Sequence, residues 1–333
     1  MPTINDVASL AGVSTATVSR ALNGKSTVSP ALVTRVLEAV TALGYQPNGP
    51  ARSLRRRETA VLALIISDVE NWFFTAIARG VEDVAHDMGY SVVLCNSDEN
   101  ADKERRYIDV AIQERVAGVI LSPTGAGTNA DVLADTGIPM VAVDRPLPVG
   151  FGDTVLVDTR QAARMATEHL LAQGYGRIGC VTGPAGVRTA DDRLAGYRDA
   201  LRAARRRTSS TLVRRSEYKG TRAQQASAEL FAQTEPPDAL LVANSAMAIG
   251  VLAAVRELGL RPGRDVGLVA FDDAPWTAVV DPPLTVVAQP AYEVGRIAAQ
   301  LLLARIGSSR RAPAVTTLTA RLLERASSRR SAR

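Results

Sequence analysis

The chain contains little cysteine, histidine or aromatic side chain. Its 333 residues include two Cys, two His and 4% aromatic residues. Cys95 and Cys180 each accompany a short apolar run, so we expect buried thiols on strands and not a disulfide framework or a metal site. His86 and His169 lie in helical patterns away from any Cys pair. The sequence therefore predicts no metal ion and no cofactor.

Long apolar runs are also absent. No stretch of 18 apolar residues occurs, and the first residues show no basic segment followed by an apolar one. We therefore expect neither export nor membrane insertion, and a cytoplasmic location. The sequence has no GxGxxG after the first strand, no phosphate-binding loop, no GxSxG motif and no evident Ser/His/Asp set. An α/β enzyme is accordingly disfavoured.

The residues that are abundant are small and aliphatic. Hydrophobic residues make up 46% of the chain, mostly Ala, Val, Leu and Ile, which suits helices packed on a parallel sheet. The net charge is +5, and residues 1–58 hold seven Arg or Lys against three Asp or Glu. Most of the excess charge thus lies where a polyanion would be expected to bind; the alternative is an ordinary solvated basic surface.

Three short helices are predicted within residues 3–44. The first spans the region of residues 4–8 and ends before Gly12. Ser14 is a suitable N-cap for a second helix over residues 15–22. Ser29 and Pro30 open a third helix that carries an apolar stripe and ends at Gly44.

The first two of these helices have the pattern of a helix-turn-helix. Ala8 is small enough for two helices to cross closely, Gly12 permits the turn, and Val13 and Val18 anchor the second helix. Arg20 can bond guanine, and short side chains at the helix start can contact base edges or a thymine methyl. The predicted DNA contacts in this motif are Ser14, Thr15, Ala16, Thr17, Ser19 and Arg20. The alternative is an ordinary helical hairpin.

Beyond a Pro-, Gly- and Arg-rich segment at 46–58, strands and helices alternate. This order predicts two parallel α/β units in succession. A strand at 284–288 and a helix at 290–306 follow the second unit and could cross back to the first. The predicted strands are 61–66, 91–95, 117–121, 139–143, 177–182, 211–216, 238–242, 266–270 and 284–288. The predicted helices are 72–88, 101–115, 128–136, 160–173, 191–206, 221–233, 245–258 and 290–306.

The segment TINDVASLAGVSTATVSRALNG, followed by PNGPARSLR, resembles the lactose-repressor/galactose-repressor family. The resemblance extends over essentially the whole chain. It implies a hinge helix on operator DNA, with Leu54 as a wedge between base pairs in the minor groove. The alternative for Leu54 is packing in the core of the following domain. The predicted hinge contacts are Asn48, Ala51, Arg52, Leu54 and Arg55.

The resemblance also implies a fold and an assembly. We expect an N-terminal all-α helix-turn-helix domain (1–46), a hinge or linker (47–59), and an α/β periplasmic-binding-protein-like sensor (60–325). The sensor would have two doubly wound parallel-sheet lobes, one of residues 60–158 and 288–316, the other of 159–287 and 317–325. Residues 326–333 are expected as a disordered basic tail. Because the end of the chain, ERASSRRSAR, has no leucine heptads, we expect a homodimer on a pseudo-palindromic operator.

The ligand of such a sensor binds between the lobes, at the carboxyl ends of the strands. Trp72 stands where the family usually has Pro, and Ser245 where it commonly has Asp. Each assigned residue also has an ordinary structural alternative: a core position for Phe73, an ion-pair partner for Arg193, a helix cap for Asp272. The predicted effector-binding residues are Ser67, Phe73, Phe74, Asp144, Thr189, Arg193, Tyr218, Asn244, Asp272 and Gln289.

These residues suit a ligand rich in hydroxyl groups. Arg, Asp and Asn form paired hydrogen bonds with adjacent hydroxyls, and an aromatic face packs on a sugar ring. A sugar or sugar derivative is expected, with a nucleoside or purine as the alternative. The resulting prediction is a DNA-binding transcription regulator, of the repressor type, switched by a small molecule; induction and corepression both stay open. A transport-associated solute-binding protein is the competing class.

Overall fold

The computed structural model describes residues 2–22, 28–45, 59–124, 129–308 and 312–330. Contacts divide the chain into two units, residues 1–59 and 60–333. Among the described residues, no helix is long and apolar enough to cross a bilayer.

The first unit consists of helices α1 (Ile4–Ala11), α2 (Thr15–Leu22) and α3 (Pro30–Leu43), as predicted. Thr3 and Asp6 form a capping box at the start of α1, and Ser14 Oγ accepts a hydrogen bond from Thr17 N (3.2 Å) at the start of α2. Gly12 ends α1 with φ 61°, the left-handed conformation predicted for the turn. The buried core of this unit comprises Val7, Ala8, Ala11, Val18, Ala21, Val36 and Ala39.

The second unit contains two six-stranded sheets, each forming the centre of one lobe. In lobe 1 the strand order is β11-β5-β4-β3-β1-β2, and in lobe 2 it is β12-β10-β9-β8-β6-β7. The lobe 1 strands are β1 (Val61–Ile66), β2 (Ser91–Asn96), β3 (Gly118–Leu121), β4 (Met140–Val143), β5 (Asp153–Val157) and β11 (Val315–Leu318). The lobe 2 strands are β6 (Ile178–Thr182), β7 (Val213–Arg215), β8 (Ala239–Val242), β9 (Gly267–Phe271), β10 (Thr285–Ala288) and β12 (Arg321–Leu323).

Helices cover the faces of these sheets. Lobe 1 has α5 (Trp72–Asp87), α6 (Ala101–Gln113), α7 (Ala130–Thr136) and α12 (Ala291–Gly307). Lobe 2 has α8 (Thr159–Ala172), α9 (Arg188–Ala203), α10 (Gly220–Phe231) and α11 (Ser245–Glu257). The hydrogen-bonded strand pairs are parallel except for β10 with β12. The prediction of two doubly wound parallel-sheet lobes is therefore confirmed, with one antiparallel strand at the edge of lobe 2.

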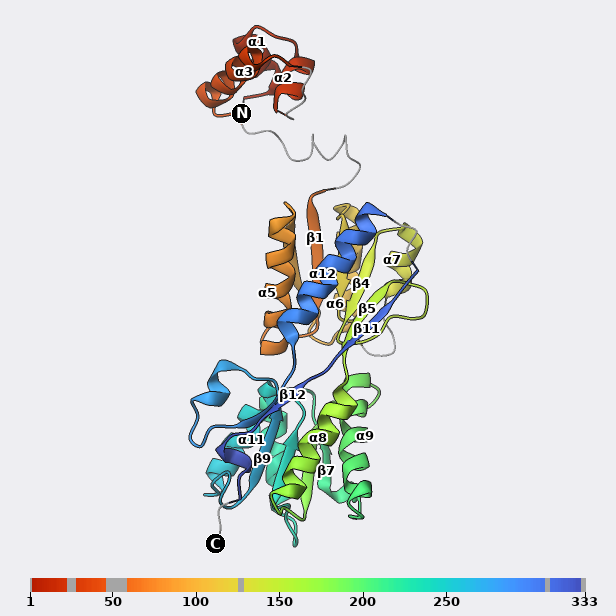
Figure 1. Ribbon diagram of the computed structural model, residues 1–333, viewed down its shortest axis with the longest axis vertical. Coiled ribbons are helices and arrows are strands. Elements are labelled where there is room, and N and C mark those ends of the chain that lie inside the picture. The colour runs from red at the N-terminus through yellow and green to blue at the C-terminus, as the bar shows by residue number, and fades with distance from the viewer. Residues whose placement is uncertain (1, 23–27, 46–58, 125–128, 309–311, 331–333) are drawn as a thin grey trace. The chain divides into compact units, whose positions relative to one another are not determined.

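The chain crosses between the lobes three times: after β5, between β10 and α12, and between β11 and β12 (Figure 1). Strand β10 stays in lobe 2 and α12 returns to lobe 1, where it packs beside α5. The alternating strand and helix patterns of the sequence did not predict β5, β11 or β12. The last two are short, half-exposed strands at sheet edges, where the apolar pattern is weak.

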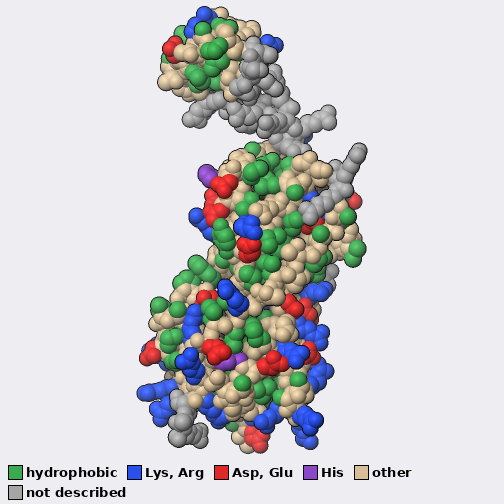
Figure 2. Space-filling model, in the orientation of Figure 1, with side chains coloured by type: hydrophobic (Ala, Val, Ile, Leu, Met, Phe, Trp, Pro, Cys, Tyr) green, Lys and Arg blue, Asp and Glu red, His purple; other side chains and the backbone are tan. Residues whose placement is uncertain are grey.

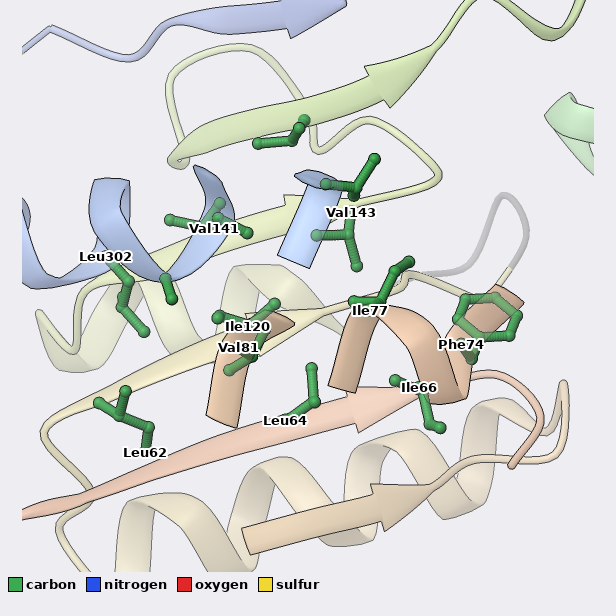
Figure 3. Packing of buried hydrophobic residues seen from close by; sticks show 14 of the residues in the cluster. Leu62, Leu64, Ile66, Phe74, Ile77, Val81, Ile120, Val141, Val143 and Leu302 are labelled. Atoms are coloured by element: carbon green, nitrogen blue, oxygen red, sulfur yellow. The ribbon is translucent and has the colours of Figure 1, made fainter. Parts of the chain in front are cut away.

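Lobe 1 has a hydrophobic cluster on each face of its sheet, and one of them lies between the central strands and the pair α5–α12. Figure 3 shows Leu64, Ile120 and Val141 from neighbouring strands on the same side of the sheet as Ile77 of α5 and Leu302 of α12. All five side chains are fully buried. The small and aliphatic composition of the chain therefore supplies a closely packed α/β core with few aromatic residues.

The end of the chain corrects one expectation. Residues 326–328 form a 3₁₀ turn in which Ser327 and Ser328 are buried, so this part is not a disordered tail. Ser327 Oγ donates to Leu268 O (2.8 Å) and accepts from Thr285 N (2.8 Å), while Ser328 Oγ bonds His169 Nε2 (2.7 Å). These hydroxyls satisfy backbone groups of β9 and β10 and the His169 ring, which composition alone could not reveal. Residues 331–333 lie outside the described residues.

The two cysteines also differ. Cys180 is buried on β6, as predicted, and burial raises its pKa to about 12. Cys95 is only half-buried, because it lies on β2 at the edge of the lobe 1 sheet. The expectation of a buried thiol was therefore wrong for Cys95.

Candidate functional site

Helix α2 exposes the side chains that were predicted to read DNA. Thr15, Ala16 and Arg20 are exposed, whereas Thr17 and Ser19 are half-buried. The Ser14 and Thr17 hydroxyls bond each other (3.0 Å), which fixes the first turn of the helix. A short helix with small polar side chains at its start and an arginine near its end has the form of a major-groove reader.

One basic residue of the first unit has a structural role that the sequence did not reveal. The Arg35 guanidinium donates from Nε (3.1 Å) and from a terminal nitrogen (2.5 Å) to Ala11 O. Arg35 thereby caps the end of α1 and braces the turn at Gly12. The predicted hinge contacts Asn48, Ala51, Arg52, Leu54 and Arg55 lie outside the described residues.

A cavity of about 320 Å³ lies between the lobes of the second unit. Its walls come from segments that follow strands of both sheets, where the carboxyl ends of the strands meet. Nine of the ten predicted effector-binding residues line it: Phe73, Phe74, Asp144, Thr189, Arg193, Tyr218, Asn244, Asp272 and Gln289.

Ser67 is the exception. Its side chain is fully buried and its hydroxyl bonds Ser122 Oγ (3.0 Å), which joins the ends of β1 and β3. The neighbouring Asp68 lines the cavity in its place. Because successive residues of an extended chain point to opposite sides, a shift of one position separates a lining residue from a buried one.

Backbone strain is concentrated around this cavity. Five lining residues other than glycine have a positive φ: Asp98 (54°), Glu99 (55°), Asp144 (67°), Tyr218 (59°) and Asp272 (73°). Such conformations are unfavourable for residues with a β-carbon and are typical of ligand-binding sites, where they aim side chains at a ligand.

Arg193 is positioned by lobe 2 with part of its donor capacity unused. Its side chain lies 4.4 Å over the centre of the Phe271 ring, and one terminal nitrogen donates to Ala243 O (2.6 Å). Its Nε is buried and makes no hydrogen bond. A ligand atom that accepts a hydrogen bond would complete this arrangement.

Two buried carboxyl groups accompany Arg193. Burial raises the pKa of both Asp144 and Asp272, while the charge of a nearby arginine opposes that shift. Asp272 accepts hydrogen bonds from Gln289 Nε2 (2.6 Å) and Ser245 N (3.4 Å), so it also contacts the start of α11. Carboxyl groups in this state favour ligands that donate hydrogen bonds.

Aromatic and capping residues complete the walls. The Phe73 and Phe74 rings meet edge to face at 5.2 Å, and Tyr218 lies over Gly183, where a β-carbon would come within 2.2 Å of its ring. Asn244 caps α11 through Met247 N (2.7 Å), so it combines a structural role with a place in the cavity wall. The cavity thus offers apolar ring faces beside hydrogen-bonding groups.

Several lining residues were not predicted. Asp98 and Glu99 follow β2 after Ser97, so the same strand-end rule that found Asp144 could have found them. Arg145 follows Asp144 at the end of β4. Its guanidinium forms a fork with Glu99 (2.7 and 2.5 Å) and also donates to Pro123 O (2.9 Å). The other lining residues are Asp68 and Asn71, which follow the first strand, and Pro184, Glu217 and Lys219, which were not predicted.

Comparison with known proteins decides the family. Residues 3–48 match the bacterial regulatory proteins of the lacI family, and residues 167–328 match a periplasmic binding protein-like domain. The ribose operon repressor of Halalkalibacterium halodurans is 38% identical over 306 residues, which cover 92% of this chain and 91% of the relative. This chain belongs to the LacI family.

Solved structures extend the likeness over both units of this LacI-family protein. The Lac repressor dimer bound to operator and the anti-inducer ONPF matches with a TM-score of 0.85 and 26% identity, covering 98% of this chain and 99% of that one. The transcriptional regulator CelR in complex with cellobiose has a TM-score of 0.75 and 32% identity, covering 98% and 100%. The LacI-family chain is therefore a DNA-binding transcription regulator with a helix-turn-helix unit and a two-lobed binding unit.

Proposed function

We propose that this LacI-family regulator is a repressor that binds a pseudo-palindromic operator as a homodimer and responds to an uncharged monosaccharide in the interlobe cavity. Ribose is our first candidate, because a ribose operon repressor is 38% identical over nearly the whole chain. The observation that carries the proposal is the cavity itself, which combines two phenylalanines and a tyrosine with buried Arg193 and Asp272 and with the largely buried side chain of Asp144. The proposal includes no catalysis, and it places the chain in the cytoplasm because operator DNA is there.

The charges of the cavity favour a neutral ligand. Among the described lining residues, six carboxyl groups face three cationic side chains. Arg145 is occupied by Glu99, and Lys219 by Asp68 and Asp98. The lining carboxylates would thus repel a phosphate or carboxylate on the ligand. Only Arg193, among the described lining residues, keeps donors that could offset this repulsion.

The size of the cavity is also suitable. At about 320 Å³ it is near the lower end of small-molecule sites. A single sugar ring fits such a volume with its hydroxyls towards carboxyl and amide groups and its apolar face towards an aromatic ring. The sugars and sugar-derived ligands of relatives differ, and the cavity favours the smaller ones.

An apolar surface on lobe 1 supports the dimer. Strand β2 is the edge of its sheet, and its Val93 and Leu94 are 51% and 43% exposed. Met88 at the end of α5 and Val110 on α6 add exposed apolar side chains on elements that contact β2. An apolar edge strand promotes association unless it is covered, and a second copy of the chain would cover it.

The test is a calorimetric titration of the full chain with ribose, ribose 5-phosphate, cellobiose and guanine at one salt concentration. We expect ribose to bind and ribose 5-phosphate to bind at least about tenfold more weakly, since one repulsive contact of about 1.4 kcal/mol produces that ratio. Guanine binding without ribose binding would favour the purine alternative. Binding of ribose 5-phosphate in preference to ribose would contradict the charge argument.

A matched pair of variants makes the titration specific. Arg193→Met removes the donors in the cavity, whereas Arg198→Met removes a charge from the same helix at a residue that does not line it. We expect loss of sugar binding only in the first variant. Equal binding by both would remove Arg193 from the proposed site.

A further inference from the structure

Lys219 connects the two lobes at the rim of the cavity. It lies in lobe 2, at the N-cap of α10, and its side chain extends to carboxylates of lobe 1. Lys219 Nζ donates to Asp98 Oδ1 (3.0 Å) and lies 3.4 Å from Asp68 Oδ2. Asp68 follows β1 and Asp98 follows β2, so a single ammonium group bridges two strand ends of the opposite lobe.

The partners are held in place by their own lobes. Asp68 is mostly buried, and its other oxygen accepts a hydrogen bond from Glu70 N (3.0 Å). Asp98 has a left-handed backbone, as has Tyr218 immediately before Lys219. Strained conformations persist where the surrounding structure fixes them, so the bridge joins two preorganised segments and not two free side chains.

The ionisation of the groups is consistent with a real ion pair. The bond to Lys219 is the main cause of the lowered pKa of Asp98. Partial burial lowers the pKa of Lys219, but the bonds and charges of Asp98 and Asp68 outweigh this effect and the pKa is raised. Asp98 and Lys219 therefore stay charged at neutral pH, and the bridge responds to salt more than to pH.

We propose that Lys219 is a positioning residue that latches the two lobes together by pairing with Asp98 and Asp68, and so retains a ligand in the cavity. A ligand enclosed between lobes leaves only when the lobes separate, and separation breaks both contacts of Lys219. The effect on ligand release rests on the proposed sensor function; the effect on lobe spacing does not.

The expected size of the effect is modest. Lys219 and Asp98 have side chains that are 44% and 40% exposed, whereas the Asp68 side chain is 11% exposed. Exposed pairs each contribute little, and two carboxylates on one ammonium group give about a fivefold change in ligand dissociation rate. Raising the salt concentration to about 1 M should remove most of this difference by screening.

The first experiment measures lobe spacing in the absence of any sugar. Spin labels at Arg106→Cys on α6 and Gln225→Cys on α10, both exposed positions, report the interlobe distance once Cys95 and Cys180 are replaced by Ser and Ala. We expect Lys219→Met to shift the distance distribution of the full chain towards longer values. Lys219→Arg, which keeps the charge, should retain the original distribution. An unchanged distribution in Lys219→Met would overturn the latch.

The second experiment is a double-mutant cycle on ligand release. Lys219→Met and Asp98→Asn are measured singly and together by stopped-flow dissociation of the bound sugar identified by calorimetry. Lys103→Met is the matched control, because Lys103 also pairs with Asp98 (3.5 Å) but lies in the same lobe. We expect faster release in Lys219→Met, no further increase from Asp98→Asn in that background, and no change in Lys103→Met.

Each outcome separates the latch from other roles. If Lys219→Met and Asp98→Asn accelerate release additively, Lys219 acts as a direct ligand contact and the latch is wrong. If no sugar binds but Lys219→Met still widens the lobe spacing, the proposed sensor function fails while the latch stands.

Discussion

At the scale of single residues, the cavity combines carboxyl groups that burial has pushed towards the neutral form with donors that lack partners. Burial raises the pKa of Asp144 and of Asp272, and Arg193 Nε is buried without a hydrogen bond. A ligand whose hydroxyls donate to these carboxyl groups stabilises their charged form. Binding and proton release are therefore linked.

The affinity for the sugar should depend on pH in a defined direction. A hydroxyl donor lowers the raised pKa of Asp144 in the complex, so the complex holds fewer protons than the free protein. The affinity is then highest above the raised pKa and is lost as the pH falls through it, by up to about tenfold per pH unit for each proton released. Calorimetric titrations between about pH 5 and pH 8 measure this dependence.

Asp144→Asn is the matched variant for this prediction. Asn tolerates the left-handed backbone at this position (φ 67°), so the fold should be retained. We expect a weaker affinity with a smaller dependence on pH. A wild-type affinity that rises as the pH falls would mean that the ligand does not donate to these carboxyl groups.

Gly183 controls the cavity without lining it. A β-carbon at Gly183 would lie 2.2 Å from Tyr218 Cζ, so Gly183→Ala should displace the tyrosine ring. We expect sugar affinity to fall by about tenfold, or about 1.4 kcal/mol, because the ring leaves its place in the wall. Gly176→Ala is the control, since nothing lies within 4 Å of a β-carbon there. Equal affinities in the two variants would show that Tyr218 does not form part of the site.

The residues of the cavity were predictable to the extent that strand ends could be located. Nine of the ten predicted residues line the cavity, because parallel strands bring their carboxyl ends to one edge. Ser67 does not line the cavity, whereas its neighbour Asp68 does, since the side on which a residue lies depends on where the strand stops. Lys219 could not be predicted, because its partners Asp68 and Asp98 belong to the other lobe and lie more than 100 residues away in sequence.

At the scale of elements, close contacts between helices depend on glycine. A β-carbon at Gly295 of α12 would lie 2.1 Å from Ile77 O of α5, and one at Gly80 of α5 would lie 2.2 Å from Tyr292 O. The two helices therefore approach backbone to backbone at the face of the lobe 1 sheet. The same pair carries Phe73 and Phe74 at the start of α5, so its spacing also positions the cavity wall.

Gly295→Ala should destabilise the protein although alanine favours helix. The displaced backbone costs about 1–3 kcal/mol, as overpacking of a tight core generally does. Gly307→Ala, at the end of the same helix, meets no atom within 4 Å and should be neutral or slightly stabilising. Urea unfolding of both variants measures the difference. Equal stability of the two would contradict the close helix contact.

Element prediction succeeded where the apolar pattern was long, but it missed the interior strand β5 and the edge strands β11 and β12. The other core strands and the long helices of both lobes follow the predicted order, because each has a strong apolar pattern. The strands β11 and β12 and the turn at 326–328 are short, and their stability comes from partners far away in sequence. Ser327 and Ser328 are polar and flanked by arginines, so composition suggested a free tail.

At the scale of the whole molecule, the exposed edge of lobe 1 is the surface on which dimerisation would depend. Leu94→Glu places a charge on the edge strand β2, where 43% of the leucine is exposed. We expect dissociation to monomers and a loss of operator affinity of at least about a hundredfold, because one reader contacts only half of the site. Sugar binding should be retained, since Leu94 does not line the cavity.

Val149→Glu is the control for that variant. Val149 is a fully exposed apolar residue in the loop between β4 and β5, so a charge there should change neither assembly nor DNA binding. Analytical ultracentrifugation with the two variants gives the oligomeric state directly. A Leu94→Glu protein that remains dimeric would exclude the β2 edge as the interface.

The distribution of charge over the whole chain agrees with this division of roles. Figure 2 shows acidic and basic side chains interspersed over the two lobes on the face in view. Residues 1–58, in contrast, hold seven basic residues against three acidic ones. The N-terminal segment therefore carries most of the excess positive charge, which attracts the DNA phosphate backbone. In the rest of the chain the positive and negative charges nearly cancel.

The central claim is that one chain reads a specific DNA sequence and changes that reading when a sugar binds. The most direct test selects bound sequences from a random DNA pool with the full chain, at one fixed salt concentration, with and without ribose. The account predicts enrichment of a pseudo-palindromic sequence and a change in its recovery when ribose is present. Enrichment of no sequence, or of a palindrome whose recovery ribose does not alter, would contradict it.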